Sequence, residues 1–163
     1  MSWDIFPFEG SFQVKRLEDP VLPEPARFAE DPAECQACRR ADEACLWTDA
    51  RWRLFAPEER TGVPALLLEP REHLDLGDLD EKYAAELGVL IVRVERAMRS
   101  VSGVAGVHVN RWGDGGAHLH LWFLARPEGM VQLRGSCLPD WLDILPPLPP
   151  DSGTPSAGTS LAP

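Results

Sequence analysis

Apolar residues recur at helical spacing in the second half of the chain. Steps of three and four residues separate them, which is the spacing of one face of an α-helix. The positions are Leu79, Tyr83, Leu87, Leu90, Val94, Met98 and Val101. Asp78 and Glu81 fit a variant of the capping box at the start, and Gly103 fits a C-terminal cap. The pattern predicts one long helix whose apolar stripe lies in the core.

Shorter apolar runs on both sides of this helix predict β-strands. Residues 51–55 and 64–68 form two runs joined by a turn, and the second is apolar on both faces, as in a central strand. Residues 107–111 follow the helix, and a short glycine-rich loop joins them to a strand predicted over residues 115–127. A short helix is predicted over residues 138–145, with a proline in its first turn.

The strand predicted over residues 115–127 carries the candidate chemistry. Alternation of side chains across a strand divides its residues between two faces. One face holds His118, His120, Trp122 and Leu124, and the other holds Leu119, Leu121 and Phe123. The two imidazoles would lie about 7 Å apart, the rise of two strand residues. They follow Gly115 and Gly116, which let a ligand approach the backbone, so this stretch predicts a ligand site.

A Cys-x-x-Cys pair at Cys35 and Cys38 is the second chemical signal. Its spacing lets both sulfurs point at one cation, as in the first half of a tetrahedral zinc site. A thioredoxin-type redox pair would need a preceding βαβ pattern, which this sequence does not show. Two unliganded cysteines in a helix remain the alternative until two further ligands are identified.

Composition and charge limit the classes of function. With 163 residues, 44% of them hydrophobic, the chain suits one globular domain. A net charge of −10 argues against a nucleic acid duplex as partner, because such a partner needs clustered Lys and Arg. A small phosphorylated ligand needs only backbone N–H groups and one or two local charges.

The ends of the chain differ in composition from its middle. We expect an N-terminal arm over residues 1–27, a folded domain over residues 28–145, and a Pro-rich disordered tail over residues 146–163. No stretch approaches the roughly 20 apolar residues that span a bilayer. The first residues lack the basic and apolar regions of a signal peptide, so we expect a cytoplasmic protein without membrane contact.

Three motifs in this order resemble the histidine-triad superfamily, which includes the galactose-1-phosphate uridylyltransferases. Residues 118–126 read His-Leu-His-Leu-Trp-Phe-Leu-Ala-Arg and are similar to the family's His-φ-His-φ-His-φ-φ run, where φ is apolar. Residues 110–116 resemble its Asn-containing hairpin loop, and residues 67–73 resemble the strand that ends in Pro-Lys-x-His before the long helix. The resemblance covers roughly residues 28–130.

The resemblance implies a fold and a metal site. The fold would be α+β, an antiparallel sheet of about five strands with one long helix on a face, usually paired into a homodimer. In family members with an N-terminal Cys-x-x-Cys, zinc is held at the positions that match Cys35, Cys38, His73 and His118. Four such ligands leave no open position, so the zinc would be structural. The alternative is that Cys45 replaces one of the histidines.

The resemblance also implies a reaction. His120 matches the nucleophile that attacks an α-phosphorus and forms a covalent nucleotidyl-histidine, with Asn110, Gly115 and Gly116 near the phosphate oxygens. The third triad histidine is replaced by Trp122, whose indole cannot deliver a proton at neutral pH. The uridylyltransferases have glutamine there, also no proton carrier.

Two functions therefore stay open. The first is a nucleotidyl hydrolase or transferase acting on a small nucleotide or nucleotide conjugate. The second is a catalytically impaired nucleotide-binding or scaffold protein of the same fold, with Trp122 in the pocket.

Overall fold

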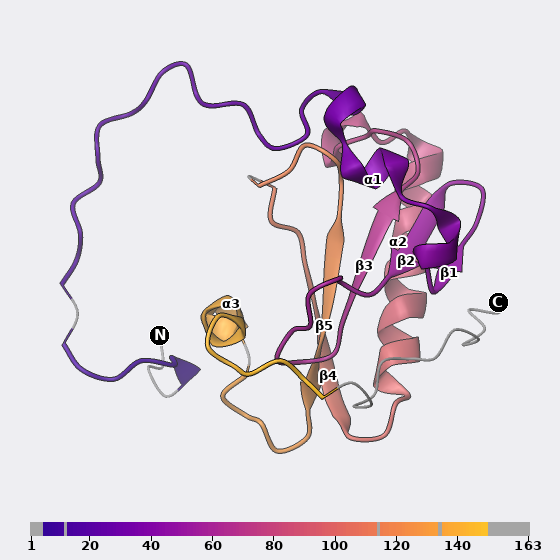
Figure 1. Cartoon of the computed structure of the whole chain (residues 1–163). Coiled ribbons are helices and arrows are strands. Elements are labelled where there is room, and N and C mark those ends of the chain that lie inside the picture. Colours follow the sequence, from indigo (N-terminus) through magenta and orange to yellow (C-terminus); the bar gives the residue numbers. More distant parts are fainter. Residues whose placement is uncertain (1–4, 12, 114, 134, 150–163) are drawn as a thin grey trace.

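The core of the protein is a five-stranded antiparallel sheet with one long helix on a face (Figure 1). The computed structural model describes residues 5–11, 13–113, 115–133 and 135–149. The strand order is β1-β2-β3-β5-β4, which places β3 at the centre. The strands are β1 (Trp47–Thr48), β2 (Trp52–Phe55), β3 (Ala65–Pro70), β4 (Val104–Asn110) and β5 (Leu121–Pro127). The predicted α+β fold is confirmed.

The helix α2 (Glu81–Arg99) forms where the apolar spacing predicts it. Its buried residues are Tyr83, Leu87, Leu90, Val94 and Met98, all members of the predicted stripe. The cap differs from the prediction, because the side chain of Asp80 accepts a hydrogen bond from the backbone N–H of Tyr83. Asp78 instead completes a capping box with Asp75 on the preceding turn. The helix therefore begins three residues after Asp78.

Six short helical segments also lie within the described residues. Two are α-helical, α1 (Gln36–Arg39) and α3 (Leu138–Leu142), and α3 is three residues shorter than predicted. The 3-10 turns cover Pro32–Glu34, Asp42–Ala44, Leu76–Asp78 and Gly135–Cys137. None of the helices within the described residues combines the length and the apolar character that crossing a bilayer requires.

The two faces of the sheet pack against different parts of the chain. Leu66 and Leu68 of β3 and Phe123 of β5 face α2 in the main core. On the opposite face, Ala65 and Leu124 pack with Leu133 and Leu138 in a second, smaller core that includes α3. This second core covers only part of the sheet face opposite α2, and the cavity described below lies on the rest of that face.

The start of the last strand also differs from the prediction. Residues 115–120 are not in a strand, and β5 begins only at Leu121. The backbone N–H of Leu119 donates to the carbonyl of Leu74, beyond the end of β3, at 2.8 Å. The N–H of Ala117 donates to the carbonyl of Phe28 at 3.0 Å. Because these groups bond to loops, no sheet ladder forms there, although Leu119 still packs in the main core as predicted.

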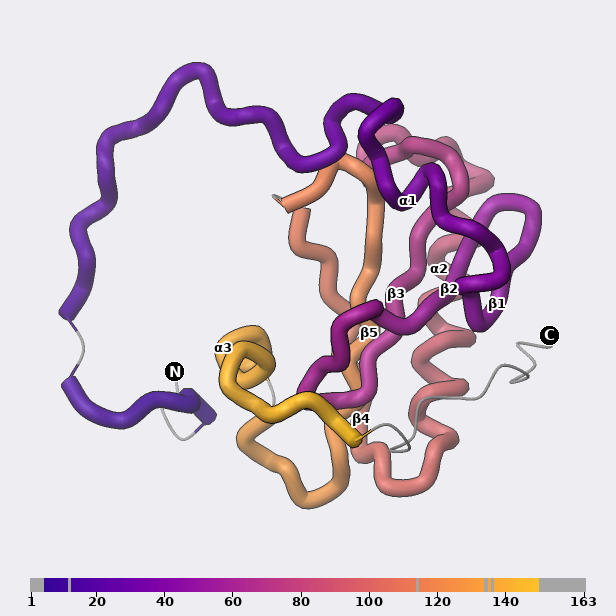
Figure 2. The backbone as a smooth tube through the Cα atoms, viewed as in Figure 1, coloured from indigo at the N-terminus to yellow at the C-terminus, as the bar shows by residue number. Residues whose placement is uncertain are grey.

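The N-terminal arm runs outside the body of the protein before it docks on the loop that precedes β5 (Figure 2). Residues 13–27 contain no helix or strand. Phe28 then forms a parallel bridge with Gly116, and Arg27 pairs with Asp75 at 2.6 Å. Most of the predicted tail, residues 150–163, lies outside the described residues.

Candidate functional site

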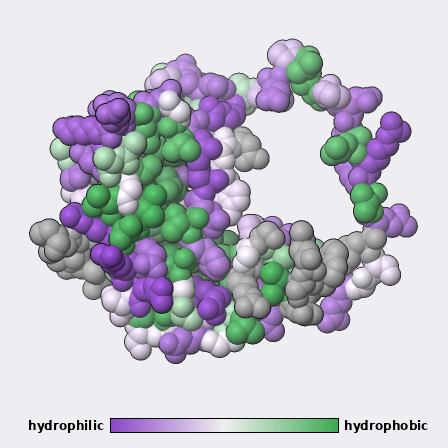
Figure 3. All heavy atoms as spheres, turned by 180° about the vertical axis from the view of Figure 1, so that it is seen from behind, coloured by the Kyte–Doolittle hydropathy of each residue, from purple (hydrophilic) through white to green (hydrophobic). Residues whose placement is uncertain are grey.

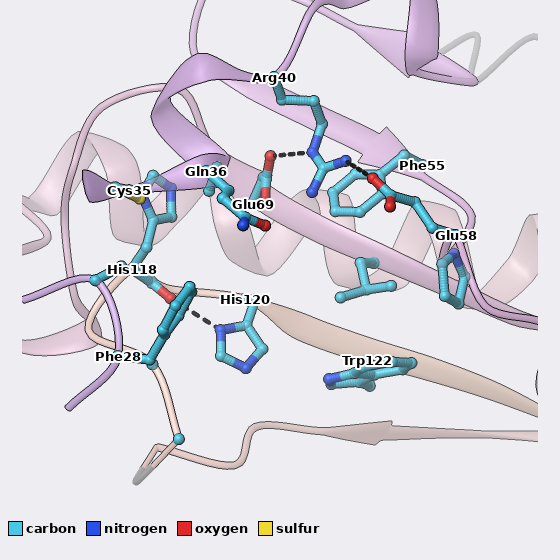
Figure 4. A pocket seen from close by; sticks show the side chains of 16 residues that line it. Phe28, Cys35, Gln36, Arg40, Phe55, Glu58, Glu69, His118, His120 and Trp122 are labelled. Atoms are coloured by element: carbon cyan, nitrogen blue, oxygen red, sulfur yellow. Dashed lines mark hydrogen bonds and ion pairs between the residues drawn. The ribbon is translucent and has the colours of Figure 1, made fainter. Parts of the chain in front are cut away.

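A cavity of about 430 Å³ opens on the sheet face opposite α2, within the range of small-molecule sites (Figure 4). Alternation along the strands places the side chains of Leu67 and Glu69 in β3 and Trp122 in β5 on this face. The start of α1 and the loop before β5 supply the other walls. Among the lining residues are His118, His120, Gly115 and Gly116, all predicted from the sequence.

Cys35, Cys38, His73 and His118 converge at one end of this cavity. Their ligand atoms all lie within 4.8 Å of one another. Cys35 Sγ lies 3.4 Å from His118 Nδ1, and Cys38 Sγ lies 3.4 Å from His73 Nδ1 and 3.6 Å from His118 Nδ1. Zinc–sulfur bonds of about 2.3 Å and zinc–nitrogen bonds of about 2.0 Å, at tetrahedral angles, separate sulfur from nitrogen by about 3.5 Å. The four side chains therefore fit one tetrahedral cation.

The backbone fixes which nitrogen of His118 faces the sulfurs. His118 Nε2 lies 2.9 Å from the carbonyl oxygen of Pro70, and a carbonyl only accepts, so Nε2 carries the proton. Nδ1 then presents its lone pair to Cys35 and Cys38. Metal-bound histidines are commonly oriented by donating their other ring N–H to a carbonyl, a carboxylate or water. Burial lowers the pKa of His118, which keeps the imidazole neutral as a ligand must be.

The thiol of Cys35 is buried, and that of Cys38 beside it is half-buried. Burial, with the neighbouring thiol of Cys35, raises the pKa of Cys38 to about 11. A bound cation has the opposite effect, because it deprotonates a thiol that coordinates it. Cys45 is not in this group, and its thiol lies 3.8 Å from the carbonyl of Ala41.

His120 lines the cavity beside the cluster but takes no part in it. Its Nδ1 lies 2.8 Å from the carbonyl oxygen of His118, so Nδ1 donates the proton and Nε2 carries the lone pair. A side chain at Gly116 would start 3.6 Å from Cε1 of this imidazole, so the glycine keeps the approach to the ring open. An imidazole whose Nε2 is free in a cavity can act as a nucleophile.

The other two predicted site residues lie side by side but differ in access. Asn110 of β4 is in register with Trp122 of β5. Trp122 lines the cavity, and its ring packs edge-on against that of Trp112, with 6.1 Å between the ring centres. Asn110 is not among the lining residues.

A charged pair that the sequence analysis missed lies on the cavity wall. Glu69 of β3 has a side chain only 3% exposed, and Arg40 Nε donates to its Oε1 at 2.9 Å. Burial raises the pKa of Glu69, and the positive charge of Arg40 opposes that rise. A carboxylate inside the run Leu-Leu-Leu-Glu-Pro of a buried strand was the signal that could have revealed it.

Ion pairs hold the loops that frame the cavity. Asp75, after β3, pairs with Arg27 of the arm and with Arg111 after β4. Burial alone would raise the pKa of Asp75, but hydrogen bonds from Arg27, from the backbone of Leu76 and from Arg111 lower it to about 2. The ionised carboxylate therefore ties the arm to both loops beside the histidines.

Comparisons with known proteins support the fold. No family model matches the chain, and no curated protein matches it. A histidine triad nucleotide-binding protein from Sulfolobus tokodaii matches with a TM-score of 0.50 and 20% identity, over 58% of this chain and 70% of that one. Two further matches are histidine triad proteins from Bradyrhizobium japonicum and Mycobacterium smegmatis.

The Bradyrhizobium protein is 26% identical with a TM-score of 0.47, and the match covers 52% of this chain and 64% of that one. The present chain thus spans less than two thirds of the length of that relative. The Mycobacterium protein, a zinc-bound structure, is 22% identical with a TM-score of 0.46, over 53% of this chain and 67% of that one. The uridylyltransferase branch remains a prediction, but the predicted resemblance is confirmed in the architecture: the chain has the fold of the histidine-triad superfamily.

Proposed function

We propose that this protein binds a small nucleotide or nucleotide conjugate and transfers or hydrolyses its nucleotidyl group through His120. The observation that carries the proposal is the environment of this imidazole. Its Nδ1 is fixed on the carbonyl of His118, which leaves Nε2 as the nucleophile on the cavity wall. The same carbonyl belongs to a residue of the cysteine and histidine cluster, so the two sites share one backbone segment.

The proposed reaction has two displacements at one phosphorus. His120 Nε2 attacks the α-phosphorus, a P–N bond forms, and the bond to the leaving group breaks. Water or an acceptor hydroxyl then attacks the phosphorus, its proton passes to solvent, and the P–N bond breaks, which restores the imidazole of His120. Trp122 occupies the third triad position and cannot supply a proton, so the leaving group takes its proton from solvent. This step should limit the rate for poor leaving groups, because a general acid contributes about 10² to 10⁴.

The second candidate is a binding or scaffold protein that has lost turnover. The observation in its favour is Trp122, whose indole lines the cavity and contacts Trp112. In that case the cavity would hold a nucleotide without attack by His120.

We also propose that Cys35, Cys38, His73 and His118 hold one structural zinc. The metal would supply a crosslink between the start of α1, the end of β3 and the loop before β5. A closed site of this kind contributes about 10 to 16 kcal/mol of apparent binding free energy, enough to decide whether the surrounding loops are ordered.

The resemblance to histidine-triad proteins further implies a homodimer. Figure 3 shows apolar side chains gathered in a band on the side of the molecule that carries α2. Val89 and Val92 of this helix are 50% and 44% exposed. We propose that a second copy of the chain packs on this face.

The metal proposal predicts the effect of Cys35→Ser. Elemental analysis should give about one zinc per chain for the wild type and far less for the variant. The melting temperature should fall by about 10 °C or more, because a crosslink worth several kcal/mol is lost. Cys45→Ser is the matched control, since its thiol lies outside the cluster, and it should keep the zinc. An unchanged zinc content in Cys35→Ser would exclude the proposed ligand set.

The reaction predicts a covalent adduct on His120. When the wild type is mixed with dinucleotides, nucleoside phosphoramidates or nucleotide sugars and quenched, mass spectrometry should show one added nucleotidyl group. His120→Ala should lose the adduct and at least about 10³ in turnover. His108→Ala, a histidine of β4 in register with Leu124, should behave as the wild type. Binding of these compounds with neither adduct nor product would favour the binding protein instead.

The dimer proposal predicts a charge-sensitive interface. Light scattering after gel filtration should give twice the chain mass for the wild type. Val89→Glu should shift it to one chain mass, because a carboxylate would be buried without a partner. Leu17→Glu, at a residue 93% exposed on the arm, is the control and should stay dimeric. A monomeric wild type would rule the proposal out.

A further inference from the structure

Arg40 is the single Lys or Arg among the described residues that line the cavity. The chain as a whole carries a net charge of −10, so attraction of an anionic ligand has to come from local groups. The cavity wall also carries Glu58 and Glu69, two carboxylates against one guanidinium. The arrangement of these three side chains therefore decides which anion can enter.

Two contacts hold the guanidinium of Arg40 in one orientation. Its Nε donates to the buried carboxylate of Glu69 at 2.9 Å. Its central carbon lies 3.7 Å from the centre of the Phe55 ring, a cation–π contact (Figure 4). Glu69 thus occupies one edge of the guanidinium, and the Phe55 ring covers one of its faces. Within the described part of the chain, neither Nη1 nor Nη2 donates a hydrogen bond.

A weakly held carboxylate lies at the remaining edge. Glu58 Oε1 is 3.9 Å from Nη1 of Arg40, too far for a hydrogen bond. The side chain of Glu58 is 92% exposed, so little holds it in place. It can leave without exposing any buried surface, and an anion that takes its position would meet two N–H donors of a fixed guanidinium.

Stability alone gives a weak reason for this pair. Burying a carboxylate such as that of Glu69 costs free energy that its attraction to Arg40 barely offsets, and apolar residues of similar size often replace such pairs without loss. What the pair does provide is a preorganised cation on a cavity wall. Preorganisation raises affinity because the side chain loses little freedom on binding.

We propose that Arg40 binds a second anionic group of the ligand, separate from the phosphorus that His120 attacks, and that this group displaces Glu58. The inference rests on the proposed function, and it narrows the ligand to nucleotides with a further phosphate. Such a group would accept from Nη1 and Nη2 while Glu69 and Phe55 keep the guanidinium in place. Arg40 is thus a specificity-determining residue.

Titration calorimetry with ADP, AMP and inorganic pyrophosphate tests the inference. The wild type should bind ADP more tightly than AMP. Arg40→Gln should weaken the binding of ADP and pyrophosphate by about 10-fold or more, and the binding of AMP by less than about 3-fold. The reason is that only ADP and pyrophosphate carry a second phosphate that reaches Nη1 and Nη2 of Arg40. Arg39→Gln, one residue away and outside the cavity lining, is the matched control.

The variant Glu58→Gln should change the affinity in the opposite direction, and it should leave the fold intact because Glu58 is exposed. Its affinity for ADP and pyrophosphate should rise about 3-fold, since the competing carboxylate is gone. The control Glu59→Gln should leave both affinities unchanged. The inference would be overturned if ADP bound with the same affinity to the wild type, Arg40→Gln and Glu58→Gln, and pyrophosphate likewise. Failure of both nucleotides to bind, with pyrophosphate binding still dependent on Arg40, would overturn the proposed function and leave Arg40 as the anion site. A wild type that binds none of the three would overturn both.

Discussion

The contacts of His118 are the constraint on which the site depends. Its Nε2 is committed to the carbonyl of Pro70 and its Nδ1 to the sulfurs of Cys35 and Cys38. These contacts bring together three segments that are remote in sequence: the turn before α1, the end of β3 and the loop before β5. Because both nitrogens are used, the residue cannot rotate, and the backbone carbonyl of His118 stays where His120 Nδ1 reaches it. The free Nε2 of His120 follows from this geometry.

The sequence predicted best those elements whose signal is local and periodic. The stripe of α2 repeats over five turns, and each of its buried positions was identified from spacing alone. Strands β2, β3 and β4 were found within a few residues. The predicted start of β5 was wrong because the alternation of apolar and polar residues continues from His118 to His120. In the structure, the backbone hydrogen bond from Leu119 to Leu74 takes these residues out of the sheet. Spacing contains no information about such partners.

The residues that were missed owe their roles to distant neighbours. Strand β1 has only two residues, too few for a period. Arg40 follows a cysteine motif and looks like a surface charge in sequence, and only the fold sets it against Glu69 and Phe55. The four residues of the cysteine and histidine cluster were predicted together because a family resemblance supplied His73 and His118 as partners for the cysteine pair. Asn110, inferred from the same resemblance, is the last residue of β4 and does not line the cavity.

The proposed function gives each histidine of the motif a separate task, His118 in a metal crosslink and His120 at phosphorus. This division of tasks requires that Cys35, Cys38, His73 and His118 bind one zinc as a closed tetrahedral set. X-ray absorption at the zinc edge of the purified protein identifies the ligands of that zinc. We expect two sulfur ligands at about 2.3 Å and two nitrogen ligands at about 2.0 Å. A shell with three sulfurs, or with an oxygen in place of a nitrogen, would exclude this ligand set.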